Sequence, residues 1–350
     1  MKTKKRILVA PLDWGIGHAT RCISIIKALI ENGYEVVIAA DNRPLHLLST
    51  EFPKTEIIRL EGYNITYSRN IPMSINMIFQ IPKILLQIRK EHINLDEIIK
   101  NYNVDGVISD NRYGLHSKKV PCVFITHQLE IKSPYFTKHI RNFNYNYINK
   151  FDFCWIIDDK ETNLAGSLSS PKIQPKNTIY IGTQSRFNYK EIKKKYDFLA
   201  IVSGPEPQRT ILERGLINCL KIREEKSLIV LGKPEIMSSK KIGNLEIKSH
   251  LNADEMNHAI LESKLIICRP GYSTIMDLKK LGCHAFFIPT PGQTEQEYLA
   301  SRFYKKNICY FQKQSEFNFN EGILACKSFK GFSKIKEPSN NWQELFSIFN

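Results

Sequence analysis

The chain has 350 residues, which is too long for one ordinary hydrophobic core and suits two domains. Hydrophobic residues make up 42% and aromatic residues 11% of it, so it can bury substantial cores, and global disorder is excluded. Lys and Arg total 50 against 35 Asp and Glu, and the net charge of +15 favours an anionic partner: a nucleic acid, an anionic membrane surface or a phosphorylated ligand.

Cysteine usage and the N-terminus indicate the compartment. The eight cysteines contain no CxxC pair, so neither a zinc ribbon nor a thioredoxin-type redox centre is indicated. The basic N-terminus is followed by an apolar stretch that Pro11 and Asp13 break at once, unlike a signal peptide. No run approaches the roughly 20 apolar residues of a membrane span. We therefore expect a soluble cytoplasmic protein with reduced thiols, at most attached peripherally to the inner face of the cytoplasmic membrane.

Strands and helices alternate through the first half of the chain. Residues 6–10 form an apolar run typical of a buried strand, and a glycine-containing loop follows over 11–18. Residues 22–31 carry apolar side chains at helical spacing and stop at Asn32-Gly33, a signal for a helix C-cap. This alternation predicts a parallel, doubly wound α/β sheet. Further strands are expected at 34–40, 55–60, 105–109, 121–126 and 153–157.

The alternation breaks at residues 181–196, which include the basic run 190–195 and are typical of a domain linker. It then restarts with an expected strand at 198–202, a loop, and a helix that runs through Cys219 to Arg223. Strands are also expected at 227–231, 265–268 and 285–288. We therefore predict two Rossmann-like domains facing across a cleft, at residues 1–180 and 197–335, and a C-terminal helix within 336–350 that packs back on the first domain.

The loop at residues 13–21 lies between the first expected strand and helix. Gly15 and Gly17 let its backbone turn tightly, but the spacing is not GxGxxG and does not indicate a dinucleotide site. His18 falls at the carboxyl edge of the sheet, where ligands bind in open α/β folds, and is our first candidate for a catalytic base. Alternatively, His18 only caps the helix. Asp110 and His127 also end expected strands and are the next candidates, although each can be structural.

Three loops of the second half also run from strand to helix. Ser203-Gly204-Pro205 opens a loop whose backbone N–H groups can receive a diphosphate, with Arg209 adding charge, or it is an ordinary turn. In the second loop, Asp277 can accept both hydroxyls of a ribose, or it merely favours the helix dipole. Side chains of the third loop suit sugar hydroxyls, although alone they are more typical of a solvated helix start: Gln293, Glu295, Gln296 and Glu297.

Taken together and in this order, the four loops resemble the GT-B nucleotide-sugar glycosyltransferases, and most of all the MurG-type group of glycosyltransferase family 28. The resemblance spans nearly the whole chain. It implies that Asp277 is the acid that binds ribose, and that Arg186 in Gly182-Thr-Gln-Ser-Arg186 contacts phosphate. Gln296 and Glu297 fall where the family has a Gln pair on the donor sugar, and the change to Glu leaves the sugar open. The loops and the resemblance together predict a donor site of Arg186, Gly204, Pro205, Arg209, Leu251, Asn252, Arg269, Gly271, Ser273, Thr274, Asp277, Gln293, Gln296 and Glu297.

The resemblance implies transfer of a hexose or N-acetylhexosamine from a UDP-sugar to a hydroxyl of a lipid-linked or cell-envelope glycan. Neither a metal nor a cofactor is expected, because the family uses helix ends and basic side chains for the diphosphate and no DxD pair ends a strand. Gly15, Gly17 and Arg21 would form the acceptor-side loop. Because GIGHATRC also resembles the UDP-sugar hydrolase of pseudaminic acid synthesis, hydrolysis is the second interpretation. The third is a non-catalytic nucleotide- or nucleic-acid-binding protein, but dispersed Lys residues without a binding motif argue against a nucleic-acid partner.

Residues 74–90, SINMIFQIPKILLQIRK, combine many apolar side chains with Lys83, Arg89 and Lys90. Pro82 predicts a kinked or broken helix. One interpretation is a core helix that packs on the sheet. The other is a helix that docks on an anionic membrane surface, which would suit a lipid-linked acceptor.

Overall fold

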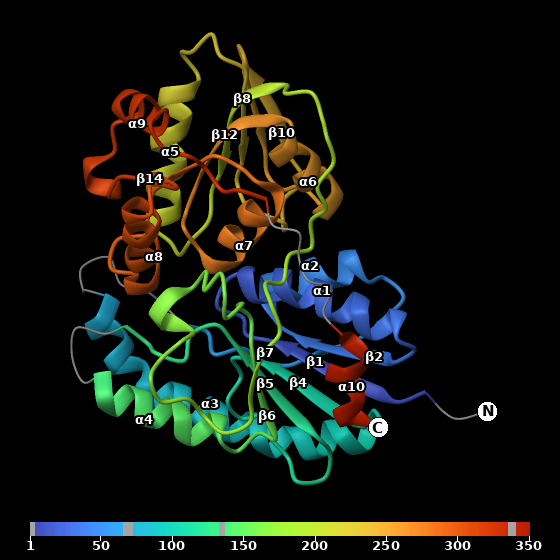
Figure 1. Cartoon of the computed structure of the whole chain (residues 1–350). Coiled ribbons are helices and arrows are strands. Elements are labelled where there is room, and N and C mark those ends of the chain that lie inside the picture. The colour runs from blue at the N-terminus through green and yellow to red at the C-terminus, as the bar shows by residue number, and fades with distance from the viewer. Residues whose placement is uncertain (1–3, 66–72, 133–136, 335–340) are drawn as a thin grey trace. The chain divides into compact units, whose positions relative to one another are not determined.

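The computed structural model describes residues 4–65, 73–132, 137–334 and 341–350. The chain divides into two compact units (Figure 1). Unit 1 contains residues 4–65, 74–132, 137–184 and 341–350, and unit 2 contains residues 185–334.

Unit 1 is built on a seven-stranded, fully parallel sheet of order β3-β2-β1-β4-β5-β6-β7. Its central strands β4 and β5 are buried at every residue, as expected where helices cover both faces. The strand order reverses between β1 and β4, and loops at such a switch point are where ligands bind in this class of sheet. The strands are β1 (Arg6–Pro11), β2 (Glu35–Ala40), β3 (Glu56–Arg59), β4 (Gly106–Asp110), β5 (Cys122–Thr126), β6 (Phe153–Ile156) and β7 (Thr178–Tyr180).

Among the described residues, five α-helices belong to unit 1. Helix α3 continues through Pro82, which excludes the broken form of the prediction and leaves the kinked form; the exposed Pro82 removes only one backbone hydrogen bond. The C-terminal helix α10 lies in unit 1, where the Phe346 ring is 6.2 Å from that of Trp155. The helices are α1 (Gly17–Glu31), α2 (Asn42–Glu51), α3 (Met73–Asn101), α4 (Thr137–Ile148) and α10 (Trp342–Phe346), with short 3-10 turns at Gly166–Leu168 and Ser347–Phe349.

Unit 2 repeats this design with the sheet order β10-β11-β9-β8-β12-β13-β14. All pairs are parallel except β10 and β11, an antiparallel hairpin that was not predicted from the sequence: β10 is polar and exposed, and β11 alternates over only four residues, with Leu245 and Ile247 buried. Here the order reverses between β8 and β12. The strands are β8 (Tyr196–Ile201), β9 (Ser227–Val230), β10 (Ser239–Ile242), β11 (Leu245–Lys248), β12 (Ser263–Cys268), β13 (Ala285–Phe287) and β14 (Tyr310–Phe311). The helices are α5 (Gln208–Leu220), α6 (Ala253–Leu261), α7 (Tyr272–Leu281), α8 (Thr294–Lys305), the 3-10 turn Gln314–Glu316 and α9 (Phe319–Cys326).

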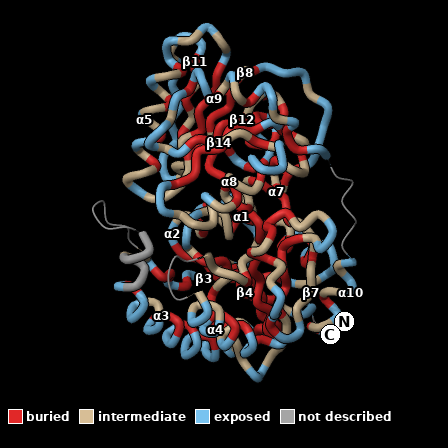
Figure 2. Tube along the Cα trace, turned by 60° about the vertical axis from the view of Figure 1, so that its left-hand side comes forward, coloured by how far each residue is buried: buried red, intermediate tan, exposed pale blue. Residues whose placement is uncertain are grey.

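Each unit has its own buried core along its strands (Figure 2). All eight cysteines are free thiols, and all except Cys219 are buried. The two doubly wound α/β sheets confirm the predicted fold class, and the predicted strands coincide with observed ones to within two residues at each end.

Candidate active-site residues in the two units

The first candidate site lies at the β1–β4 switch point of unit 1. Helix α1 begins at Gly17, earlier than predicted, so His18 and Arg21 stand three residues apart on one face of its first turns. No side chain caps this N-terminus, and its first turn contains no acidic residue. Trp14, 40% exposed, lies four residues before His18 in the preceding loop and was not among the predicted site residues.

The structure brings all three predicted catalytic candidates together around Arg21. Arg21 Nε donates to Asp110 Oδ2 at 2.6 Å, and Arg21 Nη2 also donates to Asp110 Oδ1. His18 Nδ1 lies 3.0 Å from Asp110 Oδ1 and 2.8 Å from Arg21 Nη2. Arg21 Nη1 lies 2.8 Å from His127 Nδ1. Asp110 ends β4 and His127 follows β5, so three neighbouring carboxyl edges supply this cluster.

Burial and charge set the protonation of this cluster. Burial alone disfavours a charged Asp110, but the Arg21 guanidinium and His18 outweigh it and hold the pKa of this carboxyl well below its usual range. Burial lowers the pKa of His18, with Asp110 opposing and Arg21 reinforcing that shift. Burial also raises the pKa of the Cys22 thiol well above its usual value. The site therefore offers a neutral imidazole beside a fixed carboxylate, an arrangement suited to accepting a proton.

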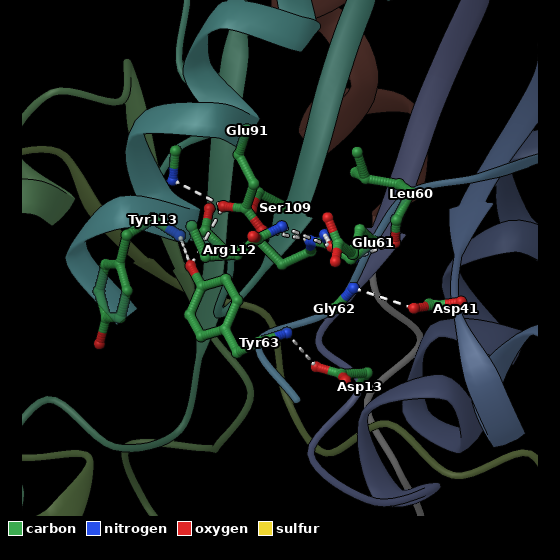
Figure 3. Close-up of polar contacts among 12 residues, drawn as sticks. Asp13, Asp41, Leu60, Glu61, Gly62, Tyr63, Glu91, Ser109, Arg112 and Tyr113 are labelled. Carbon is green, nitrogen blue, oxygen red and sulfur yellow. Dashed lines mark hydrogen bonds and ion pairs between the residues drawn. The ribbon is translucent and has the colours of Figure 1, made fainter. Parts of the chain in front are cut away.

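A second network in unit 1 was not predicted (Figure 3). Glu91 of α3 and Arg112, both fully buried, pair at 2.7 Å between Glu91 Oε1 and Arg112 Nε. Tyr63 Oη donates to Glu91 Oε2 at 3.1 Å, and Arg112 Nη2 donates to the Glu61 carbonyl at 2.5 Å. From the other side, Asp13 Oδ1 accepts a hydrogen bond from the Tyr63 backbone N–H at 2.9 Å. These bonds fix the segment after β3 against the loops after β1 and β4.

In unit 2, the β8–β12 switch point contains buried polar atoms beside a glycine. Gly204 has a φ of 107°, and a Cβ there would lie 3.2 Å from Thr290 Oγ1 and 3.8 Å from Arg269 Nε. Both atoms are buried and have no hydrogen-bond partner among the described residues. Thr290 was not predicted as a site residue. A side chain at Gly204, which Pro205 follows, would therefore crowd Thr290 Oγ1, and glycine avoids this contact.

Arg269 is a buried cation held by neutral groups. Its Nη1 donates to the carbonyls of Ile288 at 2.8 Å and Pro289 at 3.0 Å, and its Nη2 donates to the Gln208 carbonyl at 3.1 Å and to Gln314 Oε1. Burial lowers the pKa of Arg269 to about 9. No carboxylate among the described residues pairs with it within 4.0 Å. An anionic ligand would supply the missing charge.

Arg209 differs from the expectation that it adds charge for a diphosphate. Its Nε donates to Glu206 Oε1 at 2.7 Å, and its Nη1 donates to Glu213 Oε2 at 2.5 Å. Glu206 Oε2 also accepts a hydrogen bond from the Thr210 backbone N–H at 3.2 Å, which satisfies the start of α5. Two carboxylates close in sequence therefore neutralise Arg209.

Asp277 lies on α7, where Ser185 Oγ donates to Asp277 Oδ1 at 2.6 Å. Burial raises the pKa of Asp277 to about 6, although Arg186 and the Ser185 hydrogen bond oppose that shift. The N-cap of α7 is Gly271, and no side chain caps this end or places an acid in its first turn. The backbone N–H groups of this first turn, which includes Ser273 and Thr274, are therefore suited to binding an anion.

Three of the remaining predicted donor residues make hydrogen bonds within their own segments: Asn252, Gln296 and Glu297. Asn252 caps α6 in a capping box with Glu255, and Leu251 is buried just before it. Gln296 Oε1 accepts a hydrogen bond from Thr290 N at 2.8 Å, and Glu297 Oε1 accepts one from Gly292 N at 3.0 Å. Gln293 is the N-cap residue of α8 and makes no side-chain capping bond. Gln296 and Glu297 therefore hold their own loop, and each keeps one polar atom for a ligand.

Neither a cluster of metal ligands nor a membrane-spanning helix lies within the described ranges. No three His, Cys, Asp or Glu side chains of the described residues gather as metal ligands. Within the same residues, no helix combines the length and apolarity needed to cross a bilayer.

Known proteins resemble this chain in sequence and in fold. The profile of the glycosyltransferase family 28 C-terminal domain matches residues 220–344, and that of glycosyl transferase family 1 matches residues 5–178. A protein of Methanosarcina acetivorans, described as an uncharacterized glycosyltransferase, is 24% identical over 92% of this chain and 86% of its own length. MurG of Acinetobacter baumannii shares 14% identity over 99% of both chains, with a TM-score of 0.58. The spinosyn rhamnosyltransferase SpnG complexed with thymidine diphosphate shares 13% identity over 93% of both chains, with a TM-score of 0.57.

Proposed function

The chain belongs to the GT-B glycosyltransferases of the family 28 type, and from this we propose that it transfers a hexose or N-acetylhexosamine from a UDP-sugar to a hydroxyl group of a glycan or lipid-linked acceptor. The observation that carries the proposal is the cluster of His18, Asp110 and Arg21 at the carboxyl edge of unit 1. In the proposed step, His18 accepts the proton of the acceptor hydroxyl while its oxygen bonds to the anomeric carbon. The bond from that carbon to the diphosphate breaks, and UDP leaves with the electron pair.

Unit 2 supplies the features that a nucleoside diphosphate needs. Arg269 is a buried cation without a carboxylate partner among the described residues, and the N-terminus of α7 is uncapped. We assign the ribose to Asp277 and the diphosphate to Gly204, Thr290, the α7 N-terminus and Arg186. Positive side chains and helix ends can stabilise the leaving diphosphate without a bound metal, so we propose metal-independent transfer. The thymidine diphosphate bound by the structural neighbour SpnG supports a nucleoside diphosphate as ligand.

The decisive experiment is a panel of UDP-sugars scored by UDP release, with and without glycan and lipid-linked acceptors and in the presence of a chelator. Release that requires an added acceptor supports the transferase. Release with water alone would support the UDP-sugar hydrolase instead. Binding of UDP by thermal shift, without turnover of any donor, would support a non-catalytic binding protein. Loss of activity on chelation would contradict metal independence.

We also propose that α3 docks unit 1 on an anionic membrane surface. Phe79 is 74% and Leu86 63% exposed, and they lie seven residues apart on one helix face. Lys83 and Lys90 are exposed on the same stripe at helical spacing. Apolar side chains with interleaved cations suit the interface of a bilayer that carries anionic headgroups. This supports a peripheral location and a lipid-linked acceptor.

A further inference from the structure

We propose that Ser185 is a positioning residue for Asp277: its hydroxyl holds one oxygen of the carboxylate, so that the other oxygen is presented to the ribose hydroxyls of the donor. Ser185 was not among the predicted site residues. The proposal rests on the proposed function, which assigns the ribose to Asp277. It adds the residue on which discrimination between ribose and deoxyribose by that carboxylate depends.

The direction of the hydrogen bond between the two side chains is fixed by its surroundings. Ser185 Oγ accepts a hydrogen bond from the backbone N–H of Phe187 at 3.2 Å. A carboxylate oxygen only accepts, so the single hydrogen of the hydroxyl goes to Asp277 Oδ1, which lies 2.6 Å away. That distance is typical of a hydroxyl that donates to a carboxylate. Ser185 thus favours the ionised form of Asp277.

The Asp277 side chain keeps one oxygen for a ligand. Among the described residues, Ser185 is the one group that forms a hydrogen bond with this carboxylate, and Oδ2 accepts none. A ribose presents two neighbouring hydroxyls, which a carboxylate in a fixed rotamer can accept together. Without Ser185, the carboxylate would have to be ordered when the donor binds, and that loss of rotamer freedom would weaken binding.

The chain on both sides of Ser185 is anchored. Gln184, the last residue of unit 1, is buried, and its Oε1 lies 3.1 Å from Ser24 Oγ of α1. On the other side, Phe187 is buried in unit 2. The hydroxyl of Ser185 is therefore carried by an anchored backbone and can impose an orientation on the carboxylate that it contacts.

The charges around Asp277 make the effect of Ser185 measurable. Burial raises the pKa of Asp277 to about 6, and the charged groups that face it, Arg186 and Lys280 of α7, oppose that shift together with the Ser185 hydrogen bond. The nearby Cys283 thiol stays neutral at this pH, because burial raises its pKa to about 11. Removal of the Ser185 hydroxyl would leave burial with less opposition, so the pKa of Asp277 would rise further.

The first test needs no ligand. Carboxyl ¹³C spectra of the full chain labelled with ¹³C-aspartate follow the titration of Asp277, whose signal is assigned by its loss in Asp277→Asn. We expect the midpoint, near pH 6 in the wild type, to lie about one pH unit higher in Ser185→Ala, because the charged form loses a hydrogen bond.

Two further variants control this titration. Ser185→Thr keeps the hydroxyl and should titrate like the wild type. Ser263→Ala removes another buried hydroxyl of unit 2, one that donates to the Ala259 carbonyl, and should also leave the midpoint unchanged. A wild-type midpoint in Ser185→Ala would overturn the proposal.

The second test measures discrimination by isothermal titration with UDP and 2′-deoxy-UDP at pH 8, where Asp277 is ionised even in Ser185→Ala. We expect the wild type and Ser185→Thr to prefer UDP about tenfold, the value of one hydrogen bond. In Ser185→Ala the preference should fall to roughly threefold or less, because the carboxylate is no longer oriented. A Ser185→Ala variant that keeps the full preference would contradict the positioning role.

Failure of the proposed function gives a different result. A wild-type chain that binds neither nucleotide, or an Asp277→Ala variant that binds both as tightly as the wild type, would remove the proposed ribose site. The NMR titration would still decide whether Ser185 holds Asp277, so the two failures are distinguishable.

Discussion

Asp110 is an ionised side chain without exposed surface, and Arg21 makes that state possible. An isolated carboxylate at this position would be strongly destabilising, whereas a bidentate guanidinium compensates for most of the lost hydration. Because the folded-state pKa of Asp110 is depressed, the stabilisation by this pair is present at neutral pH and is lost as the pH falls through that pKa. Asp110 of this pair also orients His18. Asp110 therefore contributes both to stability and to the proposed catalysis.

At the residue scale, we expect His18→Ala to lower kcat by about 10²- to 10⁴-fold and to leave UDP affinity unchanged. In the wild type, kcat/KM should fall with decreasing pH along a limb centred below pH 6.5, because burial lowers the pKa of this base. Steady-state kinetics with a donor and an acceptor over pH 5 to 9 measure both effects. Near-normal turnover of the variant would leave His18 as a structural residue of α1 and make Asp110 the next candidate.

The second prediction at this scale concerns Asp277. Asp277→Ala should weaken donor binding by about 1.5–3 kcal/mol, the value of hydrogen bonds to a charged group, without unfolding unit 2. In the wild type, affinity for a UDP-sugar should fall as the pH drops through about 6, where the carboxylate becomes protonated and loses its charge and part of its acceptor capacity.

Isothermal titration with a UDP-sugar is the measurement, because the sugar ester blocks the phosphate group that itself titrates near pH 6 in monoesters. Asp277→Asn serves as the control and should show no such pH dependence. Unchanged affinity in the Ala variant would remove Asp277 from the ribose site.

At the element scale, the Glu91–Arg112 pair joins α3 to the segments after β3 and β4 (Figure 3). Asn111, with a φ of 58°, separates Asp110 from Arg112 in the left-handed region that asparagine tolerates. Asp110 therefore bonds to Arg21 of α1, while Arg112, two residues later, bonds to Glu91 of α3. The last residue of β4 and the turn after it therefore contribute to two buried ion pairs.

This arrangement predicts non-additive stability. Arg112→Met and Glu91→Leu should each lower the free energy of unfolding by about 3–5 kcal/mol, because each leaves the other charge buried without its partner. The double variant should lose less than the sum, by roughly 0.5–3 kcal/mol. Urea titrations that follow unit 1 give the three values at pH 7. Strictly additive losses would show that the two side chains are not coupled.

At the scale of the whole molecule, the surplus of +15 charges bears on where the chain binds rather than on how it folds. Cations attract the chain to anionic surfaces, but only exposed apolar side chains can anchor it there. The exposed stripe of α3 in unit 1 combines both kinds of residue, including Phe79, Lys83, Leu86 and Lys90.

We expect the wild type to float with anionic liposomes at low salt and to dissociate at high salt, since the attraction is screened. Phe79→Glu with Leu86→Glu should abolish flotation. The matched control, Ile211→Glu with Leu324→Glu, changes the same charge at exposed apolar residues of unit 2 and should float like the wild type. Equal flotation of both double variants, or none by the wild type, would leave α3 as an ordinary surface helix. Ile78, another apolar residue of this segment, has no described side chain.

Local signals were sufficient for much of the fold. Apolar runs such as residues 6–10 and 121–126 predicted buried strands, and the Gly and Pro residues behind them predicted the loops that follow strands in both sheets. Pro82 left two forms of α3 open, and the structure excludes the broken one because an exposed proline weakens a helix without ending it. The hairpin of β10 and β11 was missed because β10 is polar and β11 contributes only two buried apolar residues, Leu245 and Ile247.

The sequence by itself determined that His18, Asp110 and His127 follow strands, and parallel strands bring such residues to one edge of a sheet. Only the tertiary structure decided which groups they contact, because Arg21 meets Asp110 and His127 across 89 and 106 residues. The same holds for two arginines of unit 2. Arg209 is neutralised by carboxylates within four residues, whereas Arg269 is held by neutral groups as far away as Gln314. The sequence shows where in the chain a charged residue stands. Whether its charge remains for a ligand depends on whether folding brings a counter-ion next to it, as it does for Arg209 and not for Arg269 among the described residues.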